Sequence, residues 1–523
     1  MHLSRSFAIC ISCDLFTMDA ILLFALLFLL PLFAIKLFQP KNNTNINPPP
    51  SPPSLPILGH MHLLREPLHR CFFDLARKYG PIFSLRLGSR LAVVVSSPSY
   101  VAEAFTKNDV VFANRPYFWA GKYIGYNYTS LGLSPYGDHW RNLRRISKHE
   151  LLSPSQLKLT SGIRTHEVRS FLKALYDASS NDAFVKVELK HMLTNLVFNM
   201  VLRMITGKQV NCHNLRRSKG EEARFQKLIE ELFEIGASGY LGDFIPLFQW
   251  IDFQGYKKNV VRLSTEINEF LQGLIDDHRR RREADDFENG NGMIHSLLSS
   301  QEQHPEYYTD EVIKGLLQDI LSAGTDTTAV TVEWAMTNLL NNEAALNKVR
   351  DELDLHFGED KLLDEADLPK LRYLQNVVTE TLRLHPAVPL LVPHMNSEDC
   401  TIGNYHIPKG TMLFVNASAI QRDPNVWDQP MNFRPDRFEQ DGENDQRDPK
   451  MMPFGIGRRS CPGMELAQRI VGSVLGQLIQ LFEWKRMDEK MIDMEEGKGL
   501  TMPKVEPLEA MFKPRNIAHK LLS

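Results

Sequence analysis

The apolar residues of the chain recur mainly at helical spacing, and two long segments show this most clearly. The stretch from Thr309 to about Asn342 predicts one continuous helix, with acidic residues in its first turn. Roughly 33 residues at 1.5 Å each would make it about 50 Å long, enough to cross a whole domain. A second segment predicts a buried helix, because its apolar residues are spaced by four: Leu466, Ile470, Val474 and Leu478.

Near the N-terminal end the pattern mixes helix and strand. A helix is expected over 68–79, and two β-strands over 83–87 and 91–95 are separated by Gly88-Ser89. From about Pro98 to Leu384 helical spacing dominates. The expected fold is therefore mainly α with a small β region, and residues 60–523 form the main domain.

The first 59 residues have a different character. Residues 18–40 are nearly all apolar and predict a transmembrane anchor, while residues 1–17 are an extension without assigned function. Lys36 and Lys41 follow the apolar run and Asp19 precedes it, which places the rest of the chain in the cytosol. A cleaved signal peptide is disfavoured because no small-residue cleavage site follows.

A proline-rich linker over 41–59 comes next. Its consecutive prolines favour a stiff spacer that orients the following domain, and a ligand for an SH3-type domain is the alternative.

Charge and cysteine content exclude some functions. Sixty basic and 63 acidic side chains leave a net charge of -3, which gives no argument for nucleic-acid binding. Six scattered cysteines do not form a disulfide framework and suit a reducing compartment. The only marked charge run, Arg279–Arg282 followed by acidic residues, predicts a solvated loop.

One cysteine lies in an unusual setting. The stretch Phe454-Gly-Ile-Gly-Arg-Arg-Ser-Cys461-Pro-Gly463 places Cys461 in a glycine-rich loop just before the second long helix. The helix N-terminus and the neighbouring Arg458 and Arg459 favour a thiolate, which is the form that binds metals. A buried structural cysteine beside a turn is the alternative.

Three further patterns contain candidate functional residues. Trp140 and Arg144 lie one helical turn apart, and Glu380 and Arg383 share one face of a helix expected from near Pro369 to Pro386. In the middle of the long helix, residues 323–328 read Ala-Gly-Thr-Asp-Thr-Thr, which are poor helix formers and predict a local bulge.

Taken in order, these motifs resemble the cytochrome P-450 family, and the match runs over roughly 48–520. The resemblance implies the fold of that family, with haem b bound through the Cys461 thiolate. It implies that Asp326 and Thr327 deliver protons for oxygen activation. It also implies a buried network of Glu380, Arg383 and Arg437, in which Asp436 replaces a commoner glutamate without affecting the arginine. The residues implied to bind the cofactor are Trp140, Arg144, His394, Phe454, Arg459 and Gly463.

The segment 122–128 before Trp140 looks closest to plant microsomal members such as isoflavone hydroxylases. The implied activity is NADPH- and O2-dependent hydroxylation of an apolar plant phenolic, of flavonoid, isoflavone, lignan, benzophenone or xanthone type. Electrons would come from a separate NADPH-cytochrome P-450 reductase, because the chain has no dinucleotide or flavin fingerprint. The implied location is the endoplasmic reticulum membrane, with a single span and a cytosolic catalytic domain.

Several alternatives stay open at this point. Within the family these are a fatty-acid or terpenoid hydroxylase, an oxidative ring-coupling enzyme, and a peroxide isomerase or dehydratase. Outside it, a non-catalytic haem protein is the rival, and the Asp326–Thr327 pair speaks against it. Aromatic residues before Trp140, among them Trp119 and Tyr123, fit either stacking on a phenolic substrate or ordinary packing.

Overall fold

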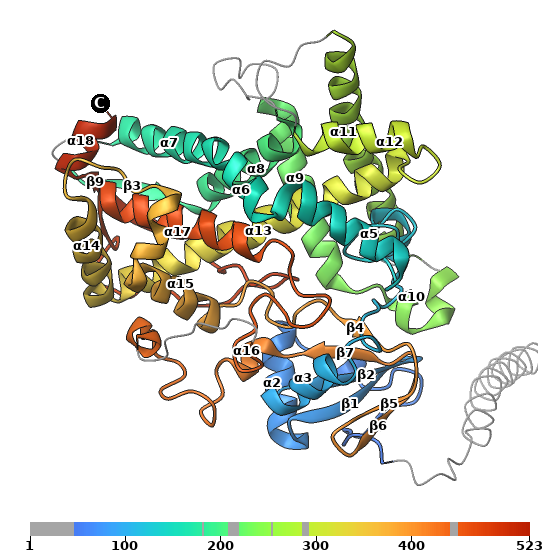
Figure 1. Cartoon of the computed structure of the whole chain (residues 1–523). Helices are drawn as coiled ribbons and strands as arrows, with labels where there is room; N and C mark the ends of the chain where they lie inside the picture. The colour runs from blue at the N-terminus through green and yellow to red at the C-terminus, as the bar shows by residue number, and fades with distance from the viewer. Residues whose placement is uncertain are drawn as a thin grey trace, which may run out of the picture.

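The computed structural model describes residues 47–179, 183–207, 219–250, 252, 255–284, 292–439 and 448–522. Most of this chain is helical, and Figure 1 shows the helices gathered in one large region with a smaller sheet region at one end. The longer helices are α2 (Leu68–Tyr79), α3 (Pro98–Thr106), α5 (Asp138–Ser147), α7 (Ser161–Ala178), α8 (Lys190–Thr206), α9 (Lys219–Ser238), α11 (Tyr256–Glu283), α12 (Met293–Gln303), α13 (Asp310–Asn341), α14 (Glu343–Phe357), α15 (Arg372–Leu384) and α17 (Met464–Leu481). The shorter ones are α4 (Trp119–Ile124), α6 (Pro154–Leu159), α10 (Leu241–Phe244), α16 (Ala417–Ile420) and α18 (Asn516–Leu522).

Helix α13 crosses the centre of the molecule (Figure 1) and packs against α8, α11, α15 and α17. The predicted helix is confirmed to within one residue at each end. Thr309 caps the start, since its side chain accepts a hydrogen bond from the N–H of Val312. From Thr328 to Leu340 every residue is buried, so this half of the helix is enclosed by the rest of the protein on all sides.

The expected bulge in α13 is wrong, because the helix runs unbroken through residues 323–328. The hydroxyl groups that were expected to disturb it donate instead to the carbonyl oxygen four residues earlier. Thr325 donates to Leu321 and Thr327 to Ala323, each at 2.7 Å. The hydroxyl groups are thereby satisfied within the helix, which continues without interruption.

The predicted strands are confirmed as β1 (Ile82–Leu87) and β2 (Arg90–Val95), an antiparallel pair joined at Gly88. They belong to a four-stranded sheet in the order β1-β2-β7-β4. Strand β7 (Met412–Val415) lies parallel to β2, and β4 (His394–Met395) lies antiparallel to β7. The β region near the N-terminus is therefore completed by strands from the C-terminal part of the chain.

Two smaller sheets lie elsewhere. Strand β9 (Glu509–Pro514) lies between β3 (Val185–Glu188) and β8 (Phe482–Lys485), and β5 (Cys400–Ile402) pairs with β6 (Tyr405–Ile407). The sequence patterns did not indicate these strands, because they have only three to six residues each.

Two boundaries differ from expectation. Helix α15 begins at Arg372 rather than near Pro369, which lies in a preceding 3₁₀ turn. The carboxylate of Glu352 accepts the N–H groups of Tyr373 and Leu374 and so stabilises the first turn. The predicted loop at Arg279–Arg282 is wrong, since these arginines form the last turns of α11. There Arg279 forms an ion pair with Asp310 at 2.6 Å.

The extension 1–17 and the anchor 18–40 lie outside the described residues, as does the first part of the linker. Among the helices that are described, none has the length and apolarity to span a membrane. Residues 47–59 are not a free spacer. The carbonyl oxygens of Pro49 and Pro50 accept hydrogen bonds from Ser84 on β1, at 3.1 and 2.7 Å, so this part of the linker belongs to the domain.

Candidate active site

The loop before α17 holds Cys461 by backbone contacts. The N–H of Cys461 donates to the carbonyl oxygen of Phe454 at 2.8 Å, which closes the loop on itself. Gly457 has a φ of 75°, and a side chain there would clash with the carboxylate of Asp109. Gly463 is the N-cap of α17, and a Cβ at this position would lie 3.8 Å from the Cys461 sulfur. The loop therefore presents the sulfur at a helix N-terminus, as predicted.

The charges around this thiol differ from the prediction. Arg458 turns away from Cys461 and pairs with Asp109 at 3.1 Å, so Arg144 is the arginine that acts on the sulfur. Burial raises the pKa of the Cys461 thiol, and the Gly463 N–H and Arg144 offset only part of this effect. Coordination to a metal would deprotonate this thiol.

Cys461 is nevertheless accessible. It borders a cavity of about 250 Å³ whose walls include Arg144, Lys148 and Phe454. Among the described residues no group of three or more His, Cys, Asp or Glu side chains is arranged to hold a metal ion.

Three arginines and a tryptophan lie together beside the cysteine loop. The guanidinium of Arg459 lies over the ring of Trp140 at 4.5 Å, and that of Arg144 lies 5.9 Å from the same ring. Arg459 also donates to the carbonyl oxygens of Ala113 and Ser134, at 2.7 and 2.5 Å. The predicted pair Trp140–Arg144 and the predicted Arg459 are thus brought together.

Arg115 is a member of this group that the sequence did not indicate. It is buried, and it donates to the carbonyl oxygens of Val392 and Pro393 at 2.7 and 2.9 Å. Burial and the nearby Arg459 lower the pKa of Arg115 to about 9, and burial and Arg144 lower that of Arg459 to about 10. The only signal in the sequence was an arginine next to a proline, which is too common to single out.

None of Arg115, Arg144 and Arg459 pairs with a carboxylate in the part of the chain that the structure describes. Buried cations are normally paired, so this cluster fits a ligand that carries acidic groups. One accessible thiol next to such a cluster suits a metal macrocycle with carboxylate side chains. Haem has both the metal and the carboxylates. The residues therefore fit the cofactor that the resemblance implies.

His394 is less suited to the predicted role as a carboxylate donor. Its Nδ1 lies 2.7 Å from the carbonyl oxygen of Phe112 and therefore donates the ring proton there. Burial and the adjacent Arg115 lower the pKa of His394 far below its ordinary value, so Nε2 carries no proton. A carboxylate nearby would have to raise this pKa before His394 could donate to it.

The network predicted around Glu380 is present. Arg383 forms two hydrogen bonds to the carboxylate, at 2.7 and 2.9 Å, and Arg437 donates to it at 3.1 Å. Glu380 and Arg383 are fully buried. The sequence did not indicate Gln421, whose amide donates to the carbonyl oxygen of Arg383 and accepts from the N–H of Met452. Gln421 therefore connects the network to the segment that leads into Phe454.

An accessible strip runs along the middle of the otherwise buried α13. Ala323 is exposed, and Asp326 and Thr327 are partly accessible, whereas Thr325 and Thr328 are buried. Since the helix lies in the core, such a strip indicates an internal space beside it. Asp326 and Thr327 are placed on this strip as predicted, but the Thr327 hydroxyl donates to Ala323 and not to Asp326.

The aromatic residues before Trp140 mostly pack against one another. The ring of Trp119 lies 4.6 Å from that of Tyr123 and 6.0 Å from that of Tyr240. Tyr128 donates to the carbonyl oxygen of Phe118 at 2.8 Å. The structure thus favours ordinary packing over a stacking surface for these residues.

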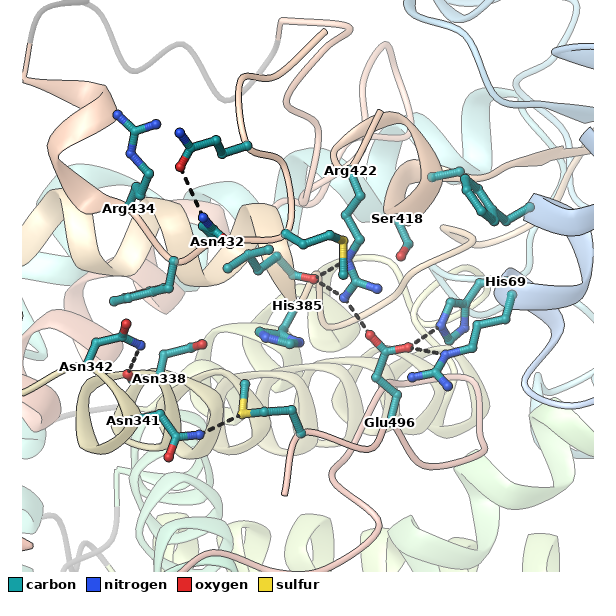
Figure 2. Close-up of a pocket in the computed structure, with 18 of the residues that line it drawn as sticks. His69, Asn338, Asn341, Asn342, His385, Ser418, Arg422, Asn432, Arg434 and Glu496 are labelled. Carbon is teal, nitrogen blue, oxygen red and sulfur yellow. Dashed lines mark hydrogen bonds and ion pairs between the residues drawn. The ribbon is translucent and has the colours of Figure 1, made fainter. Parts of the chain in front are cut away.

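An open cleft of about 880 Å³ lies apart from this site (Figure 2). It is bordered by the ends of α13 and α15, and Glu496 joins its two sides by hydrogen bonds to His69 and Arg422 at 2.7 and 2.5 Å. It contains none of the predicted site residues.

The mainly helical fold, the single thiol and the unpaired cations together define a haem-thiolate protein. The chain belongs to the cytochrome P450 family, whose model, Cytochrome P450, matches residues 49–508. It is a monooxygenase, an oxidoreductase of a family that binds haem through a cysteine thiolate and receives electrons from a redox partner.

Curated relatives cover nearly the whole chain. It is 52% identical to Cytochrome P450 81Q32 of Catharanthus roseus over 94% of this chain and 96% of that protein. It is 50% identical to isoflavone 3'-hydroxylase of Medicago truncatula, over 90% and 94% of the two chains. A solved zebra fish cytochrome P450 structure with progesterone superimposes with a TM-score of 0.73 at 23% identity, over 86% of this chain and 100% of that one. That likeness supports the fold alone.

Proposed function

We propose that this protein is a membrane-bound monooxygenase that hydroxylates a plant phenolic, using O2 and electrons from NADPH. The observation that supports this proposal most is the accessible Cys461 thiol beside the buried Arg115 and the partly buried Arg144 and Arg459, none of which has a carboxylate partner in the described structure. When bound, the haem supplies the iron at which dioxygen is reduced. The chain holds that group, orients the substrate and delivers protons.

Each part of the site has a defined task in this proposal. Cys461 would ligate the iron, and the Gly463 N–H would donate to its sulfur and so reduce the charge donated to the metal. Arg115, Arg144 and Arg459 would bind the acidic side chains of the cofactor, and Trp140 would keep Arg459 in place by stacking. Asp326 and Thr327 would provide protons from the accessible strip of α13.

The relatives support the phenolic substrate class. Besides the isoflavone 3'-hydroxylase, the chain is 48% identical to isoflavone 2'-hydroxylase of Glycyrrhiza echinata. A second candidate reaction is oxidative ring formation, because a relative of equal identity, from Sesamum radiatum, is named (+)-piperitol/(+)-sesamin synthase. Hydroxylation is favoured because the acid and the alcohol of α13 are both present and accessible.

The electron donor we propose is a separate NADPH-cytochrome P-450 reductase. On α5, Arg141 and Arg145 are exposed at i, i+4, and Lys148 follows one turn later on the same side. This basic face lies on the helix that also carries Arg144, next to the thiol. An acidic protein surface would be attracted to it, and the attraction would weaken at high salt.

We also propose that the protein is anchored in the endoplasmic reticulum membrane through residues 18–40. Exposed apolar side chains lie close to the point where the described chain begins, at Leu55, Ile57 and Leu58. Leu247 and Trp250 are 70% and 90% exposed. The two groups lie near one another, since Gly88 donates to the carbonyl oxygen of Leu58 and Ser89 donates to that of Phe244. Such a patch suits contact with a lipid surface.

The test is turnover in microsomes that contain the protein and a plant reductase, supplied with NADPH and panels of phenolics, fatty acids and terpenoids. We expect a phenolic product whose mass is increased by one oxygen, detected by mass spectrometry. A product lighter by two hydrogens would favour ring formation. Conversion of a fatty acid or terpenoid alone would contradict the substrate class, and turnover with peroxide but not with NADPH would contradict the reductase.

A further inference from the structure

The open cleft in Figure 2 has a polar floor, formed by Asn338 on α13, His385 at the end of α15 and Ser418 on α16. All three side chains line the cleft although each residue is more than nine-tenths buried. In the view of Figure 2, His385 lies between the other two. Three elements that are distant in the sequence therefore contribute polar groups to one internal surface.

The polar floor has hydrogen-bonding capacity that the described chain does not use. Neither ring nitrogen of His385 has a hydrogen-bond partner among the described residues. The Ser418 hydroxyl and the Asn338 amide oxygen have no partner there either, whereas the Asn338 amide nitrogen donates to the carbonyl oxygen of Trp334 at 2.9 Å. Buried polar groups are normally paired, so this floor fits a ligand with hydrogen-bonding groups of its own.

The imidazole of His385 is neutral and has a fixed orientation. Burial and the nearby Arg422 lower the pKa of His385 well below its ordinary value, so the ring offers one donor and one acceptor nitrogen. The ring is stacked on that of Trp334, with centroids 3.9 Å apart and 2° between the planes. Trp334 is held in turn, because its indole N–H donates to the carbonyl oxygen of Met502 at 2.8 Å. A ligand would therefore meet a preorganised group.

The buried carboxylate of the cleft is already paired with cations. Glu496 accepts hydrogen bonds from His69 at 2.7 Å and from Arg70 at 2.9 Å. Its other oxygen accepts from Arg422 at 2.5 Å. A carboxylate on a ligand would compete with Glu496 for these arginines, and a cation would compete with the arginines for Glu496. Because an unpaired buried charge is costly, the ligand that fits this cleft is uncharged.

The mouth of the cleft is apolar. Phe73 on α2 and two methionines, Met431 and Met491, line it and are 40%, 65% and 63% exposed, and we call these three residues the apolar rim. Phenylalanine and methionine side chains both make favourable contacts with aromatic rings. A volume of about 880 Å³ lies within the range of small-molecule pockets. An apolar ring system with polar substituents therefore matches both parts of the cleft.

We propose that this cleft is a second small-molecule site, separate from the site at Cys461, which binds a neutral aromatic compound that carries hydroxyl groups. The ring system lies against the apolar rim, and the hydroxyl groups reach the polar floor. The hydroxyl group suits this floor because it both donates and accepts, as His385, Ser418 and Asn338 together require. The site goes beyond the proposed monooxygenase function, and it involves binding without a chemical step.

The test is equilibrium dialysis of the full-length, haem-loaded protein, with an azole bound at the iron so that the site at Cys461 is blocked. The haem absorption spectrum verifies that the azole stays bound. The probes are naphthalenediol, dimethylnaphthalene and naphthalenedicarboxylate, substituted at the same two positions, so that only the substituents differ. The same detergent micelles without protein correct for dissolved probe.

Three variants locate the bound probe. Met431→Ser removes part of the apolar rim, and His385→Phe keeps a ring on Trp334 but removes both nitrogens. Met487→Ser is the matched control, because Met487 is also an exposed methionine but does not line the cleft.

We expect one equivalent of naphthalenediol to bind, at least about tenfold more tightly than either other probe, because only the diol satisfies the polar floor without burying a charge. Met431→Ser and His385→Phe should each weaken its binding by about two- to tenfold. Met487→Ser should leave the affinity unchanged.

Several outcomes would overturn the proposal. These are no binding of naphthalenediol to the blocked protein, equal binding of the dimethyl or dicarboxylate probe, and equal affinities in Met431→Ser and Met487→Ser. If His385→Phe yields no haem-loaded protein, the comparison of the two methionine variants decides by itself. Turnover plays no part in these measurements, so a failure of the proposed function would leave their outcome unaffected.

Discussion

The guanidinium of Arg459 lies over the indole of Trp140, with 4.5 Å between its central carbon and the ring centroid. Arg459 comes from the cysteine loop and Trp140 from α5, so this contact joins two parts of the site that are more than 300 residues apart in the chain. It also leaves the cation without a carboxylate partner in the described structure. The contact therefore supports both the position of the loop and the binding of an acidic cofactor.

Replacing Arg459 with lysine should weaken cofactor retention. Lysine cannot reproduce the planar stack on Trp140 together with the hydrogen bonds to Ala113 and Ser134. Loss of a desolvated cation–π contact is worth up to about 2 kcal/mol, so we expect haem to dissociate about tenfold faster. Transfer of haem to an apoprotein acceptor measures this rate. Arg458→Lys is the control, because Arg458 forms a partly exposed pair with Asp109, and equal rates for the two variants would contradict the assignment.

Replacing Cys461 with serine should abolish the red-shifted Soret band of the reduced, CO-treated protein. A serine hydroxyl does not supply the thiolate on which that band depends. Difference spectroscopy of microsomes is the measurement. Cys400→Ser should leave the band unchanged, since Cys400 lies on β5 in the small sheet. A Cys461→Ser protein that kept the band would rule out this cysteine as the ligand.

Replacing Glu380 with glutamine should destabilise the domain strongly. Arg383 and Arg437 would remain in place without their counter-charge, and removing one partner of a buried pair costs about 3–5 kcal/mol. We expect little haem-loaded protein and a much lower urea midpoint for what is recovered. Asp436→Asn breaks only an exposed pair with Lys348 and should cost less than about 1 kcal/mol. Similar losses of stability in both variants would show that the buried network contributes no more to stability than the exposed pair.

The pH dependence of stability should include a contribution from Asp319 on α13. Its carboxylate accepts the N–H of Gly132 at 2.7 Å, yet burial raises its pKa to about 6. The folded state then binds the proton more tightly than the unfolded state, in which the pKa is about 3.9. The contribution of Asp319 to the free energy of unfolding is therefore largest below about pH 4, and it decreases as the pH rises through 6.

Urea unfolding between pH 4 and 7 tests whether stability decreases as the pH rises. Asp319→Asn should make the stability curve flatter across this interval, because asparagine does not titrate. The exposed control Asp428→Asn, whose partner Arg434 is also partly exposed, should leave the shape of the curve unchanged. A curve for Asp319→Asn that rises or falls as steeply as that of the wild type would contradict the raised pKa.

Removal of residues 1–38 should release the protein from microsomal membranes on washing with salt or at high pH. The full-length protein should resist the same washes, because about 20 apolar residues suffice for a span. Any remaining attachment of the truncated protein should decrease when Leu247 and Trp250 are both replaced by serine. If the truncated protein resists washing as firmly as the full-length one, the anchor lies elsewhere.

Local patterns predicted the long helix α13, helix α2 and the hairpin of β1 and β2 to within one or two residues, because side-chain periodicity reports burial along one element. Such local patterns gave wrong predictions where a contact with a residue far away in the sequence determines the structure. Arg279–Arg282 were expected in a loop, but the ion pair between Arg279 and Asp310 stabilises the end of α11. The bulge expected at residues 323–328 is absent, and the hydroxyl groups of Thr325 and Thr327 donate to carbonyl oxygens within the helix.

The sequence by itself determined the order of the motifs, the identity of Cys461 as the one candidate ligand, and the family to which the chain belongs. Tertiary structure decided which groups surround that ligand. It brought in Arg115 and Gln421, paired Arg458 with Asp109, and directed the Thr327 hydroxyl to the carbonyl oxygen of Ala323. The physical reason is that a hydrogen bond or a pKa depends on neighbours in space, and these neighbours come from segments hundreds of residues apart.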